Sequence, residues 1–198
     1  MKINVITLVL FAGVFFLTSH VFGQNYNQGI GLRIGDPVGI SYKLYLQGKS
    51  AVEFNLGTVS RNSHDAYYKD SFKKKDKFDD FVYSDHDVDF TIVLMGRYLI
   101  HEAFPANVEG RLDWYYGAGA QFRISKVEYQ YFDEFNRIGS ENTTNVDFGP
   151  EAIIGVEYEL QDFPIVGFGE VSLLMEIVDR PLHFRVFGAA GIRYAFNR

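Results

Sequence analysis

The chain lacks cysteine altogether. This absence excludes a framework of disulfide bonds and thiolate metal sites, and it leaves no cysteine near the start for a lipoprotein-type lipid anchor. The chain also has no excess of basic charge, since its formal net charge is −6 at pH 7. A general nucleic-acid-binding protein is therefore not expected. At 198 residues, one domain is the natural expectation.

The long apolar run of the sequence lies near its amino terminus, from Val5 to Leu17. Lys2 supplies a basic start, and small or apolar residues precede Gln24. These features are typical of a secretory signal peptide, which we place at residues 1–23 and expect to be cleaved. A transmembrane anchor is the alternative, but the apolar run is shorter than the ~20 residues that a spanning helix needs. Residues 24–198 would then form the mature domain.

The remainder of the chain lacks a sustained apolar repeat at helical spacing. Instead, apolar residues alternate with polar or small ones, a pattern typical of β-strands. The alternation predicts eight strands, near residues 29–35, 38–46, 51–58, 89–98, 112–124, 147–160, 165–177 and 182–196. Because neighbouring strands follow one another along the chain, we expect an all-β, antiparallel, up-and-down arrangement.

Alternation alone does not decide which face of these strands is buried. A soluble, lipocalin-like barrel that binds a ligand is apolar inside, whereas a transmembrane barrel is apolar outside. Aromatic residues on the apolar faces favour the second, because they fall at two heights roughly 20–25 Å apart along a tilted strand. The predicted aromatic girdles are Tyr98, Trp114, Tyr158 and Tyr194 at the inner rim, and Phe90, Phe122, Phe148 and Phe184 at the outer rim.

The lengths of the connections follow the same alternation. Short turns near 47–50, 99–110 and 161–164 fall at the inner end, whereas two long polar segments, 60–87 and 125–145, fall at the outer end. Short inner turns and long outer loops are typical of transmembrane barrels. Both long segments are rich in aromatic residues, so we expect them to form the functional surface, in contact with lipopolysaccharide or with a partner protein.

With these girdles and loops, the chain resembles the small eight-stranded outer-membrane barrels, OmpA-like and OmpX-like. Its carboxyl end adds to the resemblance, because Gly191, Tyr194 and Phe196 match the spacing of that family's assembly signal. The resemblance implies an eight-stranded antiparallel transmembrane β-barrel in the outer membrane of a Gram-negative bacterium. It also implies contact with outer-membrane lipid and lipopolysaccharide, and insertion by the outer-membrane assembly machinery.

Charged residues of both signs lie on the polar faces of the strands. The predicted lumen charge network consists of Arg33, Lys43, Glu53, Asp89, Arg97, Asp113, Arg123, Glu151, Glu157, Glu170, Glu176, Arg185 and Arg193. In a narrow barrel these side chains would fill the lumen, and they must pair because an isolated buried charge is very costly. We expect a closed ionic core, with Arg97 and Arg193 within pairing distance of lumen carboxylates, and no conducting pore.

Candidates for catalysis or metal binding are weak. The segment Asp85–Asp89 resembles the start of a calcium loop but lacks the glycine and the final glutamate of that motif. A lipid A-modifying barrel enzyme would need serine, histidine and carboxylate groups near the outer rim, for which Ser172, Glu176 and His183 are the available residues. No motif supports them. We therefore expect no catalysis, no metal and no cofactor. We favour a structural or interaction protein, with membership of an envelope complex through its outer loops as one option.

Overall fold

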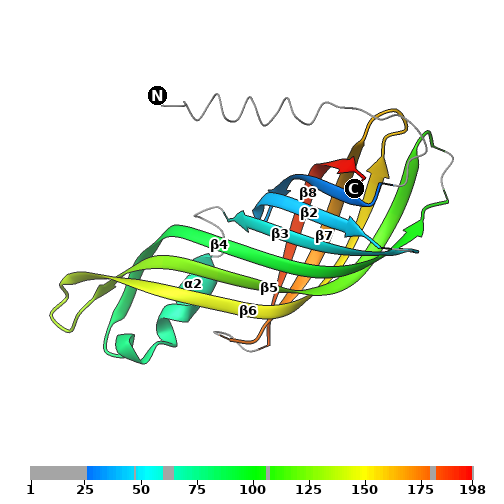
Figure 1. Ribbon diagram of the computed structural model, residues 1–198. Coiled ribbons are helices and arrows are strands. Elements are labelled where there is room, and N and C mark those ends of the chain that lie inside the picture. Colours follow the sequence, from blue (N-terminus) through cyan, green and yellow to red (C-terminus); the bar gives the residue numbers. More distant parts are fainter. Residues whose placement is uncertain (1–25, 47, 60–64, 106–107, 179–181, 198) are drawn as a thin grey trace, which may run out of the picture.

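The computed structural model describes residues 26–46, 48–59, 65–105, 108–178 and 182–197, and the predicted signal peptide lies outside these ranges. Within them, eight antiparallel strands form a closed barrel in which each strand pairs with the next and β8 pairs with β1 (Figure 1). The strands are β1 (Gln28–Gly35), β2 (Val38–Tyr45), β3 (Ser50–Thr58), β4 (Val82–Ala103), β5 (Arg111–Phe132), β6 (Ile138–Glu159), β7 (Ile165–Glu176) and β8 (His183–Phe196). The predicted all-β, up-and-down topology is confirmed.

The register of the strands fixes the tilt of the barrel. Each residue of a strand has a direct partner on the next strand. When these partners are traced once around the ring from Glu159 on β6, the path passes Arg193 and Met95 and returns to β6 at Gly149, a displacement of ten residues. In an eight-stranded barrel, such a displacement requires strands tilted by about 40° from the barrel axis. The interior of a barrel of this size is just wide enough for side chains to fill it.

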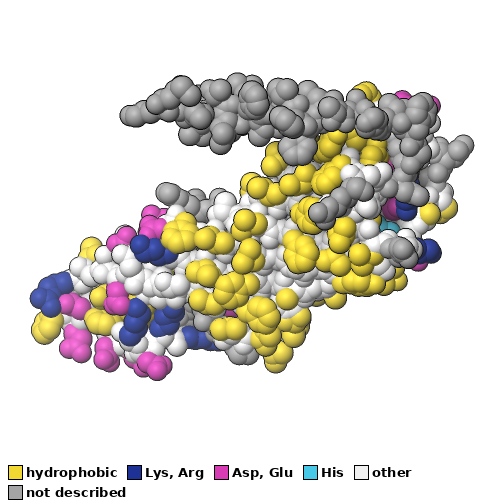
Figure 2. All heavy atoms as spheres, in the orientation of Figure 1, with side chains coloured by type: hydrophobic (Ala, Val, Ile, Leu, Met, Phe, Trp, Pro, Cys, Tyr) yellow, Lys and Arg dark blue, Asp and Glu magenta, His cyan; other side chains and the backbone are white. Residues whose placement is uncertain are grey.

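The two faces of the barrel wall differ sharply in chemistry. Large apolar side chains point outward and remain exposed, including Leu32 (63%), Ile34 (65%) and Val186 (68%). Hydrophobic side chains accordingly cover much of the barrel surface in Figure 2. Charged and polar side chains point inward, and Arg33, Glu53 and other members of the predicted network are almost completely buried.

Strands β4, β5 and β6 are 22 residues long each and project beyond the other five as a three-stranded sheet (Figure 1). We call this end of the barrel the extended end. The opposite end, with the connections after Tyr45, Ala103 and Glu159, is the short-turn end. The prediction of a long loop at 125–145 is wrong, because β5 and β6 continue through most of it and leave a turn at 133–137. The predicted loop 60–87 likewise gives way to β4 from Val82 onward.

The turn between β5 and β6 is held by one carboxylate. Asp133 Oδ1 accepts hydrogen bonds from the backbone N–H groups of Phe135 and Arg137, each at 2.9 Å, and Oδ2 accepts one from the Arg137 Nε at 2.8 Å. The Arg137 backbone N–H, and then its guanidinium, lower the pKa of the Asp133 carboxyl. This local satisfaction of donors allows the hairpin to close far from the barrel.

The extension reverses the polarity of the barrel wall. In β5, the inward positions within the barrel hold polar groups such as Gln121 and Arg123, but beyond Ser125 the inward residues are Val127 and Tyr129, both completely buried. The outward positions change in the opposite sense, from Phe122, which is 36% exposed, to exposed polar residues. On β4 only the outward face changes, from the exposed Phe90, Ile92 and Leu94 in the barrel to exposed aspartates in the extension. Along β5 the same alternate positions point inward over the whole strand, but the residues at these positions change from polar to apolar beyond Ser125.

A short helix, α2 (Asp65–Lys73), and the 3₁₀ helix η1 (Asp76–Phe78) pack against the inward face of the extension. Tyr67, Phe72 and Phe78 are buried there with Val127 and Tyr129 in one hydrophobic cluster. The rings of Phe72 and Phe78 stack with centroids 4.3 Å apart. Aromatic residues that suggested a binding loop therefore serve as an internal core that covers the extended end of the barrel.

Among the described residues, no helix combines the length and the hydropathy needed to cross a membrane.

Candidate functional site

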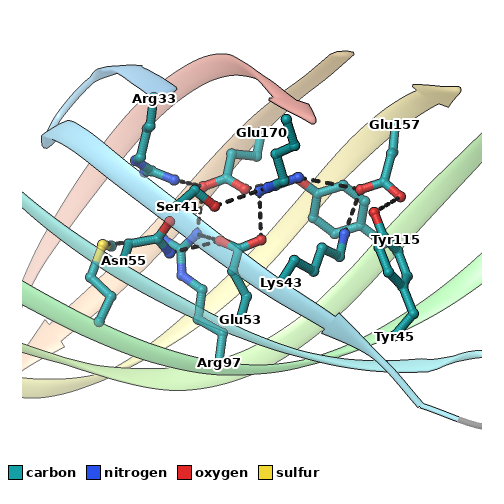
Figure 3. A network of polar contacts seen from close by, with 12 residues as sticks. Arg33, Ser41, Lys43, Tyr45, Glu53, Asn55, Arg97, Tyr115, Glu157 and Glu170 are labelled. Atoms are coloured by element: carbon teal, nitrogen blue, oxygen red, sulfur yellow. Dashed lines mark hydrogen bonds and ion pairs between the residues drawn. The ribbon is translucent and has the colours of Figure 1, made fainter. Parts of the chain in front are cut away.

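A network of buried polar side chains lies in the barrel interior and is centred on Glu53 (Figure 3). Its carboxylate accepts hydrogen bonds from Arg193 Nη2 at 2.7 Å and Arg97 Nη1 at 3.2 Å. Asn55 Nδ2 donates a third at 2.7 Å. Glu53 and the two arginines are no more than 2% exposed. Strands β3, β4 and β8 are thereby connected through one buried anion.

Two further glutamates complete the pairing of Arg97. The guanidinium donates to Glu151 on β6 through Nε at 2.7 Å and Nη2 at 3.1 Å, and to Glu170 on β7 through Nη1 at 2.5 Å. Glu170 also accepts hydrogen bonds from Arg33 on β1 and, at 2.7 Å, from the hydroxyl of Tyr115. Arg97 and Glu170 therefore each meet more than one opposite charge, and Glu151 and Arg33 are each paired through them, as burial in a low-dielectric interior requires.

Glu157 extends the network toward the short-turn end. It accepts hydrogen bonds from Lys43 Nζ at 2.5 Å, the Tyr45 hydroxyl at 2.8 Å and Arg193 Nη1 at 3.3 Å. Arg193 also lies 3.7 Å from the ring centroid of Phe168. Lys43 lies over the ring of Tyr115 at 4.5 Å. Ion pairs and cation–π contacts therefore occur side by side in the interior, next to a small hydrophobic cluster of Ala51, Leu99, Tyr115 and Ile153.

A second charge cluster lies at the extended end. Arg185 pairs with Asp147 at 3.2 Å and with Glu176 at 3.3 Å. The hydroxyl of Tyr67 in α2 lies within hydrogen-bond distance of both carboxylates, and the Arg185 guanidinium lies 4.5 Å from the Tyr67 ring. Because α2 is fixed by these contacts, helix and interior charges close this end of the barrel together.

The structure buries twelve of the thirteen residues predicted for the lumen. They are Arg33, Lys43, Glu53, Arg97, Asp113, Arg123, Glu151, Glu157, Glu170, Glu176, Arg185 and Arg193. Arg123 pairs with Asp36 in the β1–β2 connection at 3.1 Å, and Asp113 pairs with Arg111 at 2.7 Å rather than with a central cation.

Asp89 is the exception, and its placement in the lumen is wrong. Its side chain is 43% exposed and lies 3.6 Å from Lys126 on the outer surface. The register of β4 against β5 shifts between Val88 and Phe90, so that Asp89 is the extra residue of a bulge. Strict alternation places Phe90 on the outward face and Asp89 on the inward face. The bulge instead puts Asp89 on the outward face as well.

The residues of the predicted girdles lie on the outward face of the barrel. Seven of them are between 36% and 56% exposed, namely Phe90, Tyr98, Phe122, Phe148, Tyr158, Phe184 and Tyr194. Trp114 is half-buried and stacks on Tyr116, with centroids 5.3 Å apart. Phe122 and Phe148 are direct neighbours across β5 and β6.

The predicted assembly-signal residues lie in β8. Tyr194 and Phe196 stack with centroids 6.4 Å apart. Gly191 pairs with Phe168 on β7, and a Cβ atom on it would lie 2.2 Å from the Leu32 carbonyl oxygen and 2.6 Å from the Phe168 ring. The close approach of β1, together with the Phe168 ring, gives this glycine a packing role within the folded barrel.

Several polar residues of the network were missed from the sequence, among them Asp147 and Tyr67. Asp147 lies four residues before Glu151 on β6, so both side chains point to the same face of the strand. The alternation of the sequence could therefore have identified it. Tyr67 gave no such signal, because its contacts with Asp147 and Glu176 depend on a helix inside a segment that looked like a polar loop.

The residues considered for catalysis do not converge on one point. Glu176 pairs directly with His183 across β7 and β8, but Ser172 pairs with Phe187, further into the barrel. The Ser172 hydroxyl is buried and has no hydrogen-bond partner among the described residues. A nucleophile needs its base within hydrogen-bond reach, which this register does not provide. The described residues also hold no group of three or more acidic or histidine side chains arranged around a metal position.

Substituting Phe72 by alanine is expected to release α2 without opening the barrel. Phe72 is 1% exposed and contacts the rings of Phe78, Tyr83, Tyr129 and Tyr131. Truncating a buried phenylalanine costs about 3–5 kcal/mol, which exceeds what a nine-residue helix can supply by itself. Limited trypsin digestion should then cut at Lys73–Lys75 at least about tenfold faster. The control Phe135→Ala changes a 75% exposed ring and should leave the rate unchanged; equal rates for both variants would contradict the role of the cluster.

No protein-family model matches this sequence, and no curated protein matches it as a relative. Its function is therefore inferred from the geometry of the chain itself.

Proposed function

We propose that the chain is an integral outer-membrane β-barrel of the structural or interaction type, with a closed ionic lumen. The observation that carries this proposal is the reversal of polarity along β5 near Ser125. On one side of that point the wall is apolar outside and charged inside, and on the other side it is polar outside and apolar inside. A single continuous strand that does this fits two solvents, hydrocarbon around the barrel and water around the extension.

The exposed apolar band supports the same proposal. Leu32, Ile34 and Val186 expose more than three-fifths of their surface each, which water disfavours at about 25 cal/mol per Å². Contiguous apolar surface of this kind is rare on soluble monomers and typical of lipid-facing walls. The soluble, lipocalin-like alternative would instead need an apolar interior, whereas Arg97, Arg193 and Glu53 occupy it.

The extended end is the part that we propose to face the cell exterior. Short connections at the opposite end would face the periplasm, with the signal peptide directing export and the assembly machinery inserting the barrel. The described surface of the extension is polar and charged, with Phe135 and Ile138 exposed near its tip. Contact with lipopolysaccharide or with a partner protein would take place on this surface.

Fractionation of cells that produce the full chain tests this proposal. We expect the protein in the outer-membrane fraction, and we expect it to migrate faster in a denaturing gel when the sample is left unheated, because a closed barrel unfolds slowly. Recovery in the soluble periplasmic fraction, or identical migration of heated and unheated samples, would overturn the proposal.

A further inference from the structure

The three-stranded sheet of the extension has two outer edges (Figure 1). Strand β3 pairs with β4 as far as Val93, and β7 pairs with β6 as far as Glu151. Beyond these points, residues 82–92 of β4 and residues 138–146 of β6 have no paired strand on their outer side within the described part of the chain. Backbone N–H and C=O groups at such edges can bind a further strand.

The edge of β4 is protected against such pairing. Its register against β5 shifts between Tyr83 and Asp85 and again between Val88 and Phe90, and each shift is a bulge that bends the strand. Two exposed aspartates, Asp85 and Asp87, add negative charge to the same edge. Bulges and charges are both means by which natural edge strands avoid a further strand.

The edge of β6 has neither form of protection. Its pairing with β5 keeps one register over the whole strand, and residues 138–146 contain no proline. The exposed outward side chains in the middle of this edge are uncharged, namely Ser140, Asn142 and Thr144. Glu141 pairs with Lys77 at 2.5 Å, on the inward face. The buried rings of the helical segment on that face contact β4 and β5, so this core leaves the β6 edge outside it.

One hydrogen bond shows which backbone groups point to the open edge of β6. The carbonyl oxygen of Phe148 accepts a bond from the N–H of Ile177, on the β7 side, at 3.0 Å. Because backbone groups alternate in direction along an antiparallel strand, every second residue from Phe148 points its N–H and C=O to that side. The free donors and acceptors of the edge therefore belong to Ile138, Ser140, Asn142, Thr144 and Val146.

The sequence of this edge is complementary to itself about Asn142. When a strand pairs antiparallel with its own copy, residues equally far from the two-fold axis lie opposite each other. With the axis at Asn142, the apolar Ile138 meets Val146 of the second copy, and the hydroxyl of Ser140 meets that of Thr144. Asn142 meets itself, and its amide both donates and accepts. Cross-strand pairs of matched character stabilise a sheet.

The neighbouring registers are less favourable. An axis one residue nearer the tip places Glu141 opposite its own copy, and like charges in that position repel. An axis one residue nearer the barrel places Ile138 opposite Phe148, whose carbonyl oxygen is already bonded to Ile177. The edge therefore selects the register centred on Asn142.

We propose that the open edge of β6 pairs antiparallel with the same edge of a second copy of this chain. Antiparallel strands run in opposite directions, so the two barrels point away from each other. If the extension faces the cell exterior, a point that rests on the proposed function, the pair joins barrels in two facing membranes. A single pair of strands is a small interface, so we expect each contact to be weak and many contacts between two surfaces to act together.

Disulfide trapping tests the register, and the chain has no cysteine of its own to compete. In the variant Asn142→Cys the two cysteines of the pair have Cα atoms about 5.5 Å apart, which a disulfide can span. In Ser140→Cys they are more than about 10 Å apart, which is too far. On oxidation of the full chain in detergent micelles, we expect at least about fivefold more covalent dimer from Asn142→Cys than from Ser140→Cys.

A mixture of two variants adds an internal control. Ser140→Cys mixed with Thr144→Cys should form the covalent dimer, because these two positions face each other across the pair. Equal yields from Asn142→Cys and Ser140→Cys would show random collision and overturn the proposal, as would the absence of a dimer from Asn142→Cys. All three positions are exposed, and heat-modifiable migration verifies that each variant folds.

Phospholipid vesicles that carry the full chain test the joining of two membranes. Reconstitution by detergent removal inserts barrels in both orientations, and light scattering should show that the vesicles cluster. Asn142→Pro should reduce the clustering at least about fivefold, because proline removes an N–H on the open edge and spares the bonds to β5. Vesicles that contain heat-modifiable protein but do not cluster would overturn this inference alone, whereas protein that fails to insert would contradict the proposed function.

Discussion

Replacing Glu53 by glutamine is expected to lower the free energy of unfolding by about 3–5 kcal/mol, the range for removing one partner of a buried ion pair. Glutamine keeps the size of the side chain but removes the charge that Arg97 and Arg193 share at 3.2 and 2.7 Å. Both guanidiniums are about 2% exposed or less, so neither can recover hydration without opening the barrel. Equilibrium unfolding of the refolded protein by guanidinium chloride measures the loss.

The matched control for this variant is Glu102→Gln. Glu102 also forms an ion pair, with Lys49, but their side chains are 36% and 65% exposed. Exposed pairs contribute about 0–1 kcal/mol, so the control should cost little. If Glu53→Gln cost no more than Glu102→Gln, the interior would be hydrated enough to screen its charges, and the closed ionic lumen would be contradicted.

Replacing Ile154 by arginine is expected to destabilise the barrel by about 2–4 kcal/mol in lipid vesicles, as a cation at the bilayer midplane does. Ile154 lies on the outward face of β6, between Phe148 and Tyr158, and is 57% exposed. The substitution removes no internal contact of comparable size, so its cost arises from the solvent around the barrel. The measurement is again the free energy of unfolding, with the protein in phospholipid vesicles.

The control variant Ile138→Arg, on the same strand, separates the cost of placing a charge in lipid from the cost of introducing arginine at an exposed strand position. Ile138 is 71% exposed and lies at the far end of β6, in the extension that we propose to be surrounded by water. Its replacement should cost less than about 0.5 kcal/mol, as usual for an exposed surface site. Equal costs at the two positions would mean that both face the same solvent, and the proposed membrane span would be lost.

Much of the barrel could be predicted because one physical rule holds along most of its wall. Side chains point alternately to the interior and to the exterior, so the charged residues of one strand fall on one face. That rule alone located Glu53, Arg97 and Arg193 on one face. It failed at Asp89, where a single extra residue in β4 shifts the phase, because a bulge leaves no distinct mark in the alternation.

The extension was missed for a different reason. At Ser125 the alternation in β5 changes phase, because Val127 and Tyr129 take over positions that charged residues hold in the barrel. A pattern that inverts looks like the end of a strand, although the backbone continues without interruption. On β6, Thr143 and Asn145 lie opposite Val127 and Ser125 and are polar. The residues next to them in sequence are polar too, so this part of β6 shows no alternation of polar and apolar residues. The core formed by Tyr67 and Phe72 exists only through these contacts and has no local signature.

The pairing of β1 with β8 determines the order in which the chain can fold. Gln28 and Phe196 are direct partners, so the first and last strands of the domain meet in the finished ring. The other strand pairs all join neighbours in sequence, so these contacts can form before the ring closes. The final contact has the greatest sequence separation available, and contacts of that kind form slowly. Until the carboxyl-terminal strand arrives, both edges of the sheet are open to wrong partners. Closure of the ring is thus the last step of folding, and mispairing of strands is most probable before it.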